Sequence, residues 1–331
     1  MLGEPVLRSP IGFLLIPQFT VIALSSAIEP LRISNRYLDR SSHYRWQLLS
    51  LDGKSVPDDN GIMIQPDAAL ERAGKLGTLI VCADIQPERF YSAQLKHRLH
   101  AYHRAGATLG GLDTGCFLLA RAGLLDGHRV TMHWEVLDTF RERYPEIEVL
   151  STLFEVGNRR MSCAGGTAVL DMMLSTISLD HSATLAHRVA EHCLHERIRD
   201  GASRQRAVAS LRSGHSHPKL VKAMGFIEQA DGTQTLAQIA GLSDLSPRQL
   251  LRIFQEQLRE SPGRYRLRTR LERARNMLLQ TDLPVTQIAQ SCGFVSPAHF
   301  SRAFRQRFGK SPTATRHSLA PLPSLTMEVE R

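Results

Sequence analysis

Two stretches near the C-terminus repeat one pattern, a short apolar helix followed by a turn and an amphipathic helix. They are LAQIAGLSDLSPRQLLRIFQEQL at 236–258 and VTQIAQSCGFVSPAHFSRAFRQRF at 285–308. Each turn, which contains Gly241 or Gly293, ends in Ser-Pro, a pair that suits the N-cap and the first position of a helix. The repeat therefore predicts two helix-turn-helix motifs, a structure typical of proteins that read DNA.

The second helix of each motif divides into a core face and an outward face. Apolar residues recur every three or four positions, which predicts one buried stripe in each helix: Leu250, Ile253, Phe254 and Leu258, and then Phe300, Ala303, Phe304 and Phe308. The outward residues that we expect to contact DNA are Arg248, Gln249, Leu251 and Arg252 in the first helix, and Ala298, His299, Ser301, Arg302 and Arg305 in the second. Arginine suits guanine best because it can bond to O6 and N7 together. A phosphate contact is the alternative at each position, and an ordinary helical bundle is the alternative for the motifs.

Positive charge is concentrated in the part of the chain that holds the two motifs. Residues 218–318 contain 16 Lys and Arg against 7 Asp and Glu, a net charge of +9 that equals the net charge of the whole chain. Such an excess attracts phosphate and makes binding weaken as the salt concentration rises. We therefore expect double-stranded DNA to be the partner of this segment.

The segment between the motifs, 264–281, predicts a long helix with one apolar stripe. Arginines occupy much of its remaining surface, at Arg266, Arg268, Arg270, Arg273 and Arg275. The chain beyond this helix contains Ile288-Ala289, Cys292-Gly293-Phe294 and the stretch Phe300–Arg305, which leads to Gly309-Lys310-Ser311-Pro312. In these residues and in the long helix, the chain resembles the C-terminal domain of the AraC/XylS family of transcription regulators. The resemblance implies an all-α domain that lays two recognition helices into successive major-groove segments.

Length and composition favour two domains, because 331 residues with 42% hydrophobic content can form two cores. We place a first domain at 8–198 and a linker at 199–217, where small and polar residues interrupt the apolar periodicity. The DNA-binding domain follows at 218–317, and a disordered tail occupies 318–331.

Cysteine and histidine usage indicates neither a disulfide framework nor a metal site. The five cysteines (Cys82, Cys116, Cys163, Cys193 and Cys292) lack paired spacing, which favours a reducing cytoplasm. The histidine-rich stretches 97–103 and 187–195 lack a complete ligand pattern, and no phosphate-binding glycine loop is present, so we expect no metal and no cofactor. The apolar run 11–16 is too short to cross a bilayer, and no signal sequence precedes it. We expect a cytoplasmic protein without a membrane partner.

The first domain alternates apolar runs with helical stretches. The predicted strands are Ile11–Ile16, Trp46–Leu51, Thr78–Cys82, Thr108–Leu112 and Val130–His133. The predicted helices are Val21–Tyr37, Pro87–His103, Gly115–Ala122, Glu135–Tyr144, Ala168–Ser178 and Ser182–Arg199. Apolar strands separated by helices indicate a mainly parallel sheet covered on both faces, so we expect a doubly wound α/β fold of the flavodoxin-like kind.

Polar residues follow three of these strands, at the edge where such sheets bind ligands. They are Asp113-Thr114-Gly115-Cys116, Cys82-Ala83-Asp84 and Thr131-Met132-His133-Trp134. The stretch from Gly111 to Gly127, followed by His133-Trp134, resembles the DJ-1/PfpI domain, which is similar to class I glutamine amidotransferases. This domain also occurs fused to AraC-type DNA-binding domains, and the resemblance implies a ligand-sensing and dimerisation domain over residues 8–198.

One residue argues against an enzyme. In catalytic relatives a cysteine occupies the sharp strand-to-helix turn, where the thiolate is favoured. Here that position is Asp113, and Cys116 lies about one helical turn later. We therefore expect no catalytic residue. We expect instead a pocket that binds a ligand and serves as a sensor. An active amidotransferase or DJ-1-like hydrolase fused to a DNA-binding domain is the alternative.

The expected ligand is a small amine. The segment from Ala27 to Asn35, with Tyr44-Arg45-Trp46 and Asp52-Gly53, resembles regulators of arginine, glycine betaine and carnitine catabolism. Asp113 would meet the ammonium charge and Trp134 would offer a cation–π face. The expected binding residues are Asp113, Thr114, Cys116, His133, Trp134 and Glu29. Four alternatives stay open: Asp113 as a helix cap, Trp134 as a core aromatic, His133 as a structural histidine and Glu29 as a solvated residue.

The expected mechanism is a ligand-driven population shift that alters how two DNA-binding domains engage their half-sites. The resemblance implies a homodimer, and we expect an activator with RNA polymerase as a further partner. The last helices of the first domain, 183–198, offer a dimer surface.

Overall fold

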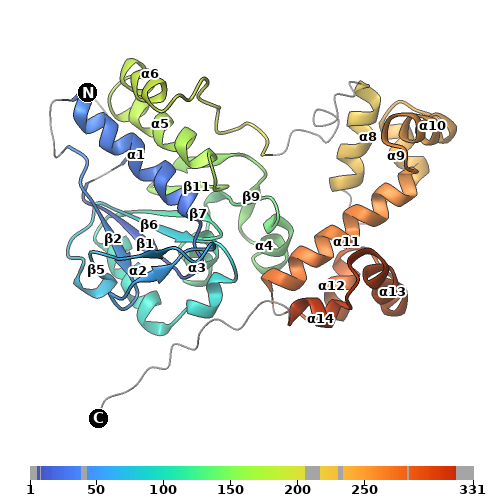
Figure 1. Cartoon of the computed structure of the whole chain (residues 1–331), viewed down its shortest axis with the longest axis horizontal. Coiled ribbons are helices and arrows are strands. Elements are labelled where there is room, and N and C mark those ends of the chain that lie inside the picture. The colour runs from blue at the N-terminus through green and yellow to red at the C-terminus, as the bar shows by residue number, and fades with distance from the viewer. Residues whose placement is uncertain are drawn as a thin grey trace, which may run out of the picture. The chain divides into compact units, whose positions relative to one another are not determined.

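The structure is a computed structural model, and it describes residues 6–7, 9–38, 43–205, 217–229, 234–281 and 283–317. The chain divides into two compact units, Met1–Gln205 and Arg206–Arg331 (Figure 1). The first unit thus runs seven residues beyond the domain end predicted at 198. The rest of the predicted linker that precedes His217 and the predicted disordered tail, 318–331, lie outside the described residues.

The first unit is built on a seven-stranded sheet with the strand order β10-β11-β7-β6-β1-β2-β5. The strands are β1 (Ile11–Leu15), β2 (Trp46–Ser50), β5 (Ala68–Ala69), β6 (Thr78–Ala83), β7 (Thr108–Asp113), β10 (Phe154–Gly157) and β11 (Arg160–Cys163). Neighbouring strands are parallel throughout, except that β10 is antiparallel to β11. From β1 the chain winds outward in both directions, which confirms the predicted doubly wound α/β fold.

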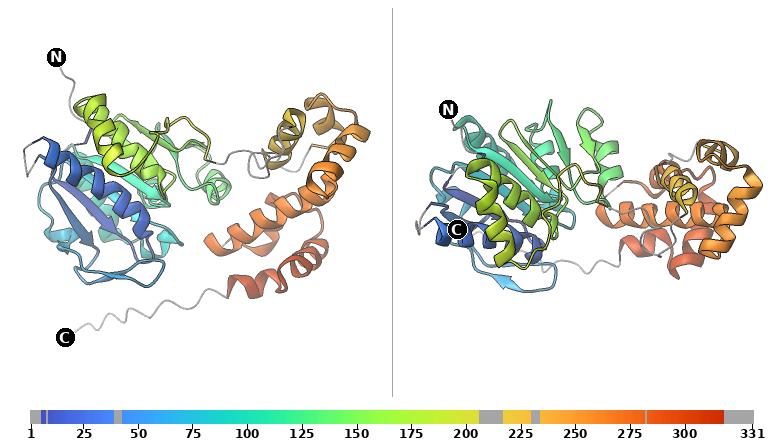
Figure 2. Two further views of the ribbon diagram at one scale, coloured as in Figure 1. Left: turned by 45° about the horizontal axis from the view of Figure 1, so that its top comes forward. Right: turned by 90° about the horizontal axis from the view of Figure 1, so that it is seen from above.

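Helices cover both faces of this sheet (Figure 2). One face packs against α1 (Val21–Tyr37), α5 (Ala168–Asp180) and α6 (Ala183–His192), and the other against α2 (Ala93–Arg104), α3 (Cys116–Arg121) and α4 (Leu137–Arg143). Side chains alternate between the faces, so Phe13 enters the first core and Leu14 the second. Burial on both faces explains why these strands are continuous apolar runs.

One predicted strand does not join the main sheet. Val130–His133 was expected there, but β8 (Arg129–Thr131) ends before His133 and pairs with β9 (Glu148–Leu150) in a separate sheet. The place beside β7 belongs to β11, whose short sequence RMSC has no apolar periodicity that would have identified it. The hairpin of β3 (Val56–Pro57) and β4 (Met63–Ile64) was also not predicted.

Two predicted helices are much shorter than expected, whereas Gly115–Ala122 and Glu135–Tyr144 lose only one or two residues at each end. The stretch Pro87–His103 is divided into a 3₁₀ turn, η2 (Pro87–Phe90), and α2, because Ser92 caps α2 by accepting a hydrogen bond from Leu95 N–H. A second 3₁₀ turn, η1 (Leu70–Arg72), precedes β6. The stretch Ser182–Arg199 stops at His192 because Leu194 takes a left-handed conformation (φ 53°).

The second unit is all helical within its described residues. Its helices are α8 (Pro218–Gln229), α9 (Leu236–Leu242), α10 (Pro247–Leu258), α11 (Pro262–Gln280), α12 (Val285–Ser291), α13 (Pro297–Phe308) and α14 (Pro312–Arg316). They form two apolar clusters, one around α8–α10 and one around α12–α13, and α11 contributes to both. The two predicted helix-turn-helix motifs are therefore present. Gly241, expected in the first turn, instead lies inside α9, and Asp244 takes the left-handed conformation there (φ 55°).

Among the described residues, no helix is long and apolar enough to cross a membrane.

Candidate functional site

The second helix of the first motif, α10, buries one face and exposes the other. Leu250, Ile253 and Phe254 are buried, as predicted, and the predicted DNA-contacting residues are exposed. The side chain of Gln249 is partly used inside the helix, because its Oε1 accepts a hydrogen bond from Ser246 N–H at 2.8 Å. Ser246 in turn accepts from Gln249 N–H, which completes a capping box. Gln249 therefore stabilises the helix start, and its side chain is less available for contacts outside the unit than the exposed side chains of Arg248 and Arg252.

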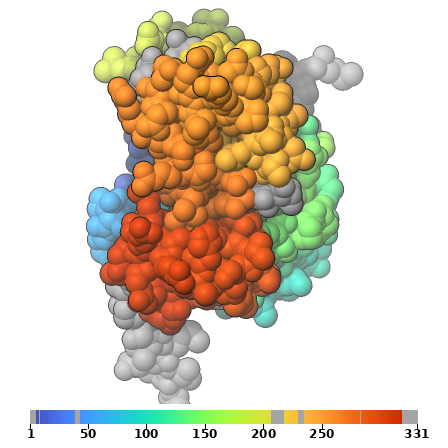
Figure 3. All heavy atoms as spheres, turned by 90° about the vertical axis from the view of Figure 1, so that its right-hand side faces the viewer, coloured from blue at the N-terminus to red at the C-terminus, as the bar shows by residue number. Residues whose placement is uncertain are grey.

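The recognition helix of the second motif, α13, has the same division. Phe300, Ala303 and Phe304 are buried, and all five predicted contact residues, Ala298, His299, Ser301, Arg302 and Arg305, are exposed. Figure 3 shows the first motif (orange) and the second (red) exposed on one face of the second unit. The unit thus presents a basic outward face on both recognition helices.

Two arginines of α11 donate hydrogen bonds to backbone carbonyl oxygens elsewhere in the second unit. Arg266 donates to the carbonyl oxygen of Gln234 before α9, and Arg270 donates to that of Gly293 in the turn of the second motif. Each arginine thus attaches one motif to the same long helix. With 19 residues α11 is about 28 Å long, comparable to the roughly 34 Å between successive major-groove segments on one face of DNA.

Sequence reasoning missed one residue on this face. Val295 is fully exposed, at 101% of its reference area, directly before the N-cap Ser296 of α13. Single apolar side chains are common on protein surfaces, so it is the place of Val295 at the start of α13 that makes it a candidate contact residue. The signal was available in the sequence: the second motif has one more residue between its Ile-Ala pair and its Ser-Pro than the first.

The first unit has its own candidate site where β7 ends. Asp113 takes a left-handed backbone conformation (φ 55°) at the turn between β7 and α3. Its side chain is buried, and Oδ2 accepts a 2.6 Å hydrogen bond from Thr20 Oγ1 at the start of α1. Gly165 lies against it, since a Cβ there would come within 2.2 Å of the carboxyl group.

Asp113 does not cap the helix that follows it through the first two amides. The Thr114 N–H donates to the Ala83 carbonyl and the Gly115 N–H to the Leu112 carbonyl. Thr114 Oγ1 is also occupied, since it donates to the Asp84 carbonyl at 2.5 Å. These partners argue against the capping alternative, and Thr114 holds the two strand ends together.

Three further carboxyl groups act on Asp113. Burial raises the pKa of Asp113 to about 7, and Asp84, Asp59 and Glu135 add to this rise. Burial also raises the pKa of Asp84 to about 6, with contributions from Asp59 and Glu135. We call Asp113, Asp84, Asp59 and Glu135 the acidic cluster. Only Asp113 is buried, whereas Asp84 and Glu135 are half-buried and Asp59 is exposed, so the negative charge of the cluster acts most strongly at Asp113 and favours a proton or a cation there.

Cys116 is not an activated nucleophile. Its side chain is fully buried on α3 and its Sγ lies 3.9 Å from the Thr131 carbonyl oxygen. Burial raises the pKa of this thiol to about 12. A thiol that stays protonated at neutral pH neither attacks a carbonyl nor binds a cation.

His133 and Trp134 lie in the turn that follows β8. His133 Nδ1 is 3.9 Å from Glu135 Oε2, and the two rings of His133 and Trp134 are 5.2 Å apart. Trp134 is partly buried against the core that holds α2, α3 and α4. This turn therefore carries Glu135 of the acidic cluster together with an aromatic side chain.

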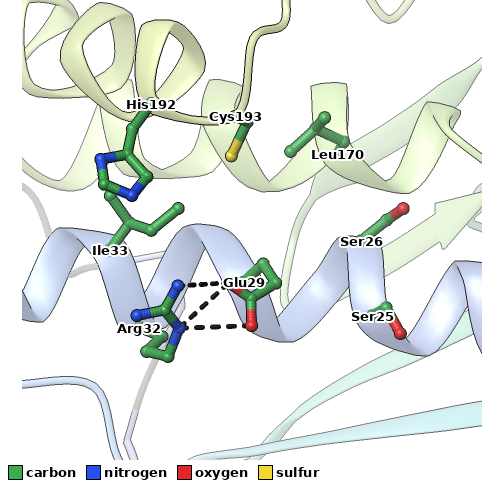
Figure 4. A pocket seen from close by; sticks show the side chains of 8 residues that line it. All are labelled: Ser25, Ser26, Glu29, Arg32, Ile33, Leu170, His192 and Cys193. Atoms are coloured by element: carbon green, nitrogen blue, oxygen red, sulfur yellow. Dashed lines mark hydrogen bonds and ion pairs between the residues drawn. The ribbon is translucent and has the colours of Figure 1, made fainter.

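Glu29 lies away from Asp113. It is nine residues beyond Thr20 on α1, about 13 Å along the helix, where it forms a 2.6 Å ion pair with Arg32. Figure 4 shows this pair in an open groove of about 410 Å³, with His192 and Cys193 at the end of α6 on the other side. The structure thus separates Glu29 from the other predicted ligand residues, and the solvated alternative describes it better.

Each of the two histidine-rich stretches contains a histidine with a local partner. His100 Nε2 lies 2.7 Å from the Ala122 carbonyl oxygen and His195 Nε2 lies 2.8 Å from Asp171 Oδ1. Within the described ranges, no group of three His, Cys, Asp or Glu side chains is arranged to hold a metal ion.

Comparison with known proteins agrees with this geometry. Residues 236–318 match a family model described as a helix-turn-helix domain. The HTH-type transcriptional regulator CdhR of Pseudomonas aeruginosa is 43% identical over 305 residues, which cover 92% of this chain and 90% of that protein. A crystal structure of an AraC family transcriptional regulator from Pseudomonas putida is 27% identical, with a TM-score of 0.51 over 55% of this chain and 98% of that one. The chain belongs to the AraC family of transcriptional regulators.

This AraC-family chain pairs its DNA-binding motifs with a second, unrelated fold. A ThiJ/PfpI family protein from Pseudomonas syringae matches 61% of this chain and 79% of its own length, with a TM-score of 0.50 and 20% identity. That likeness shows the DJ-1/PfpI-like fold alone. DNA binding follows from the helix-turn-helix domain and the regulator relatives, and those relatives are named as transcription factors rather than enzymes.

Proposed function

We propose that the chain is a transcription activator whose first unit binds a small amine or amino-acid-like effector, of the class of arginine, glycine betaine or carnitine. The observation that carries the proposal is the acidic cluster around the buried Asp113, at the turn where catalytic relatives hold a nucleophile. Cys116 stays protonated at neutral pH and leaves this turn without a nucleophile. Binding is therefore the use that the residues of this turn support best.

A bound cation would offset the unfavourable free energy of ionising the carboxyl groups of the acidic cluster. At neutral pH Asp113 and Asp84 are near their raised pKa values, so these groups still bind protons in part. An ammonium group would displace these protons and pair with the carboxylates in a poorly solvated place. Trp134, beside Glu135, would cover an alkylated ammonium.

The amine proposal predicts a saturable stabilisation of the first unit. Trp46 and Trp134 are the only tryptophans of the chain, so tryptophan fluorescence follows this unit inside the full-length protein. At 100 times its Kd, one amine among arginine, glycine betaine and carnitine should stabilise the unit by about 2.7 kcal/mol. Because the amine competes with protons on Asp113 and Asp84, its affinity should rise from pH 6 to pH 8.

The matched variants for this measurement are Asp113→Asn and Asp126→Asn. Asparagine tolerates a left-handed backbone and can still accept from Thr20, so only the charge at 113 is lost. Asp126 is exposed, and its variant should bind the amine like the wild type. Absence of a shift with every amine, or an unchanged shift in Asp113→Asn, would contradict the effector proposal.

We further propose that Arg248, Leu251 and Arg252 of α10, and Ala298, His299, Ser301, Arg302 and Arg305 of α13, contact the operator. Their exposure on the outward faces supports this role, and the charge excess of residues 218–318 supports phosphate attraction. Val295, directly before the N-cap of α13, is exposed as well. Two such units in a homodimer, acting beside RNA polymerase, would gain affinity through linkage.

Arg302→Ala should weaken binding to an operator obtained by selection from random DNA by about 5- to 150-fold and relax the preference at one base pair. Arg307→Ala is the control, since Arg307 lies on the same helix but pairs with Glu272 of α11 at 3.2 Å. Fluorescence anisotropy with the operator and its single-base variants gives the readout. An equal loss on all sequences would make Arg302 a phosphate contact instead.

A further inference from the structure

The two helix-turn-helix motifs of the second unit have separate apolar cores. The cluster around α8–α10 takes Tyr265 from α11, and the cluster around α12–α13 takes Leu271 and later residues of the same helix. Within the described residues, the two clusters have no buried member in common. Residues 266–270 of α11, which lie between them, are half-buried. The relative position of the motifs therefore depends on α11 and on the side chains that this stretch extends to either side.

Two arginines of this stretch reach the two motifs. Arg266 Nη1 donates to the carbonyl oxygen of Gln234 at 3.0 Å, directly before the N-cap Thr235 of α9. Arg270 Nη1 donates to the carbonyl oxygen of Gly293 at 3.2 Å, in the turn that leads into α13. Because they are four residues apart, the two side chains lie on one face of α11. The first motif and the second motif are thus attached to adjacent turns of a single helix.

The acceptors of both arginines are neutral. Burial lowers the pKa of Arg270, and the charge on Arg266 lowers it further. Arg268, in the same stretch, differs because it pairs with Glu260 at 2.7 Å. A hydrogen bond from a charged donor is stronger than one between neutral groups, so each arginine holds its carbonyl firmly without a salt bridge. Gly293, which has φ 76°, is thereby fixed three residues before Ser296, where α13 begins.

The spacing of the two motifs matters because DNA is a helix. One inserted base pair moves the next major-groove segment by about 3.4 Å and turns it by about 34°. Two recognition helices held at a fixed distance and angle can read both segments at one spacing, whereas motifs free to turn on α11 can follow the insertion. We propose that Arg266 and Arg270 are positioning residues that set the spacing between the two DNA segments of the operator. The inference rests on the proposed function, because it requires that α10 and α13 both contact the operator.

The test compares the operator with versions that have one base pair inserted or deleted between the two segments that the motifs read. The operator comes from selection of random DNA with the full-length protein, and fluorescence anisotropy at a fixed salt concentration gives the affinities. The wild type should bind the altered operators about 5- to 150-fold less tightly, as when a base contact is lost. The double variant Arg266→Met, Arg270→Met keeps the apolar stems and removes the donors, so this ratio should fall to about threefold or less.

The ratio separates positioning from a merely structural role. Arginines that only stabilise the fold would lower the affinity for every operator by the same factor, and an unchanged ratio in the double variant overturns the inference. Arg264→Ala, which removes an exposed arginine from α11, is the control and should keep the wild-type ratio. Arg270→Met alone should give an intermediate ratio, and it decides the question if the double variant loses its helical circular dichroism.

Two further results concern the basis of the inference. A wild type that binds all spacings equally also overturns it, because no fixed spacing then exists. An unchanged operator affinity in Arg302→Ala counts against the proposed contact of that residue, and the ratio in the methionine variants still decides the role of Arg266 and Arg270.

Discussion

Asp113→Asn is expected to make the first unit more stable by about 2–4 kcal/mol at pH 8 and to flatten the dependence of its unfolding free energy on pH. Burial raises the pKa of Asp113 from 3.8 to about 7, so between these values the folded protein holds a proton that the unfolded chain has released. The stabilising contribution of this group is therefore complete below about pH 4 and is lost as the pH rises through 7. Three pKa units correspond to about 4 kcal/mol, an upper limit because Asp84 shares the titration.

Urea unfolding followed by tryptophan fluorescence at pH 5.5 and pH 8.0 gives this stability directly, because both tryptophans lie in the first unit. Asp126→Asn controls for the substitution itself at an exposed position. A slope of stability against pH that is the same in Asp113→Asn and in the wild type would show that Asp113 does not titrate in this range.

Phe300→Ala is expected to destabilise the second motif by about 3–5 kcal/mol, the usual cost of removing a buried phenyl ring. Phe300 is fully buried, and its ring lies 5.0 Å from Phe294 and 5.5 Å from Phe304. The cluster around α12–α13 is separate from the one around α8–α10, so the first motif should stay folded. Affinity for the operator should fall by about 100-fold or more, since one of two reading helices is lost.

Circular dichroism during urea unfolding should show an earlier loss of helix in Phe300→Ala, while the tryptophan transition stays in place. Val295→Ala is the matched control: its side chain is fully exposed, so stability should change by less than about 0.5 kcal/mol. Any loss of operator affinity in Val295→Ala then measures a contact. Coincident unfolding of both motifs in Phe300→Ala would mean that α11 makes them one cooperative unit.

Sequence patterns correctly predicted those helices whose ends are set by residues close together in the chain. The helix Val21–Tyr37 has the predicted bounds, and the Ser-Pro pairs at 246–247 and 296–297 start the recognition helices. Capping and helical periodicity act over about four residues, so a pattern is sufficient to detect them. The capping role of Gln249 was readable in the same way, as a Gln three positions after Ser246.

The sequence by itself determined that this chain has two recognition helices, a basic DNA-binding unit and a carboxylate where catalytic relatives have a nucleophile. Only the tertiary structure decided what surrounds that carboxylate. Asp84 follows β6 and Asp113 ends β7, two neighbouring parallel strands of the main sheet, whereas Asp59 comes from the β3–β4 hairpin and Glu135 from the turn after β8, and all three others act electrostatically on Asp113. The same packing excludes Glu29 from the site, inserts β11 beside β7 and brings Gln205 to Met132. These contacts join residues far apart in the chain, and no local pattern records them.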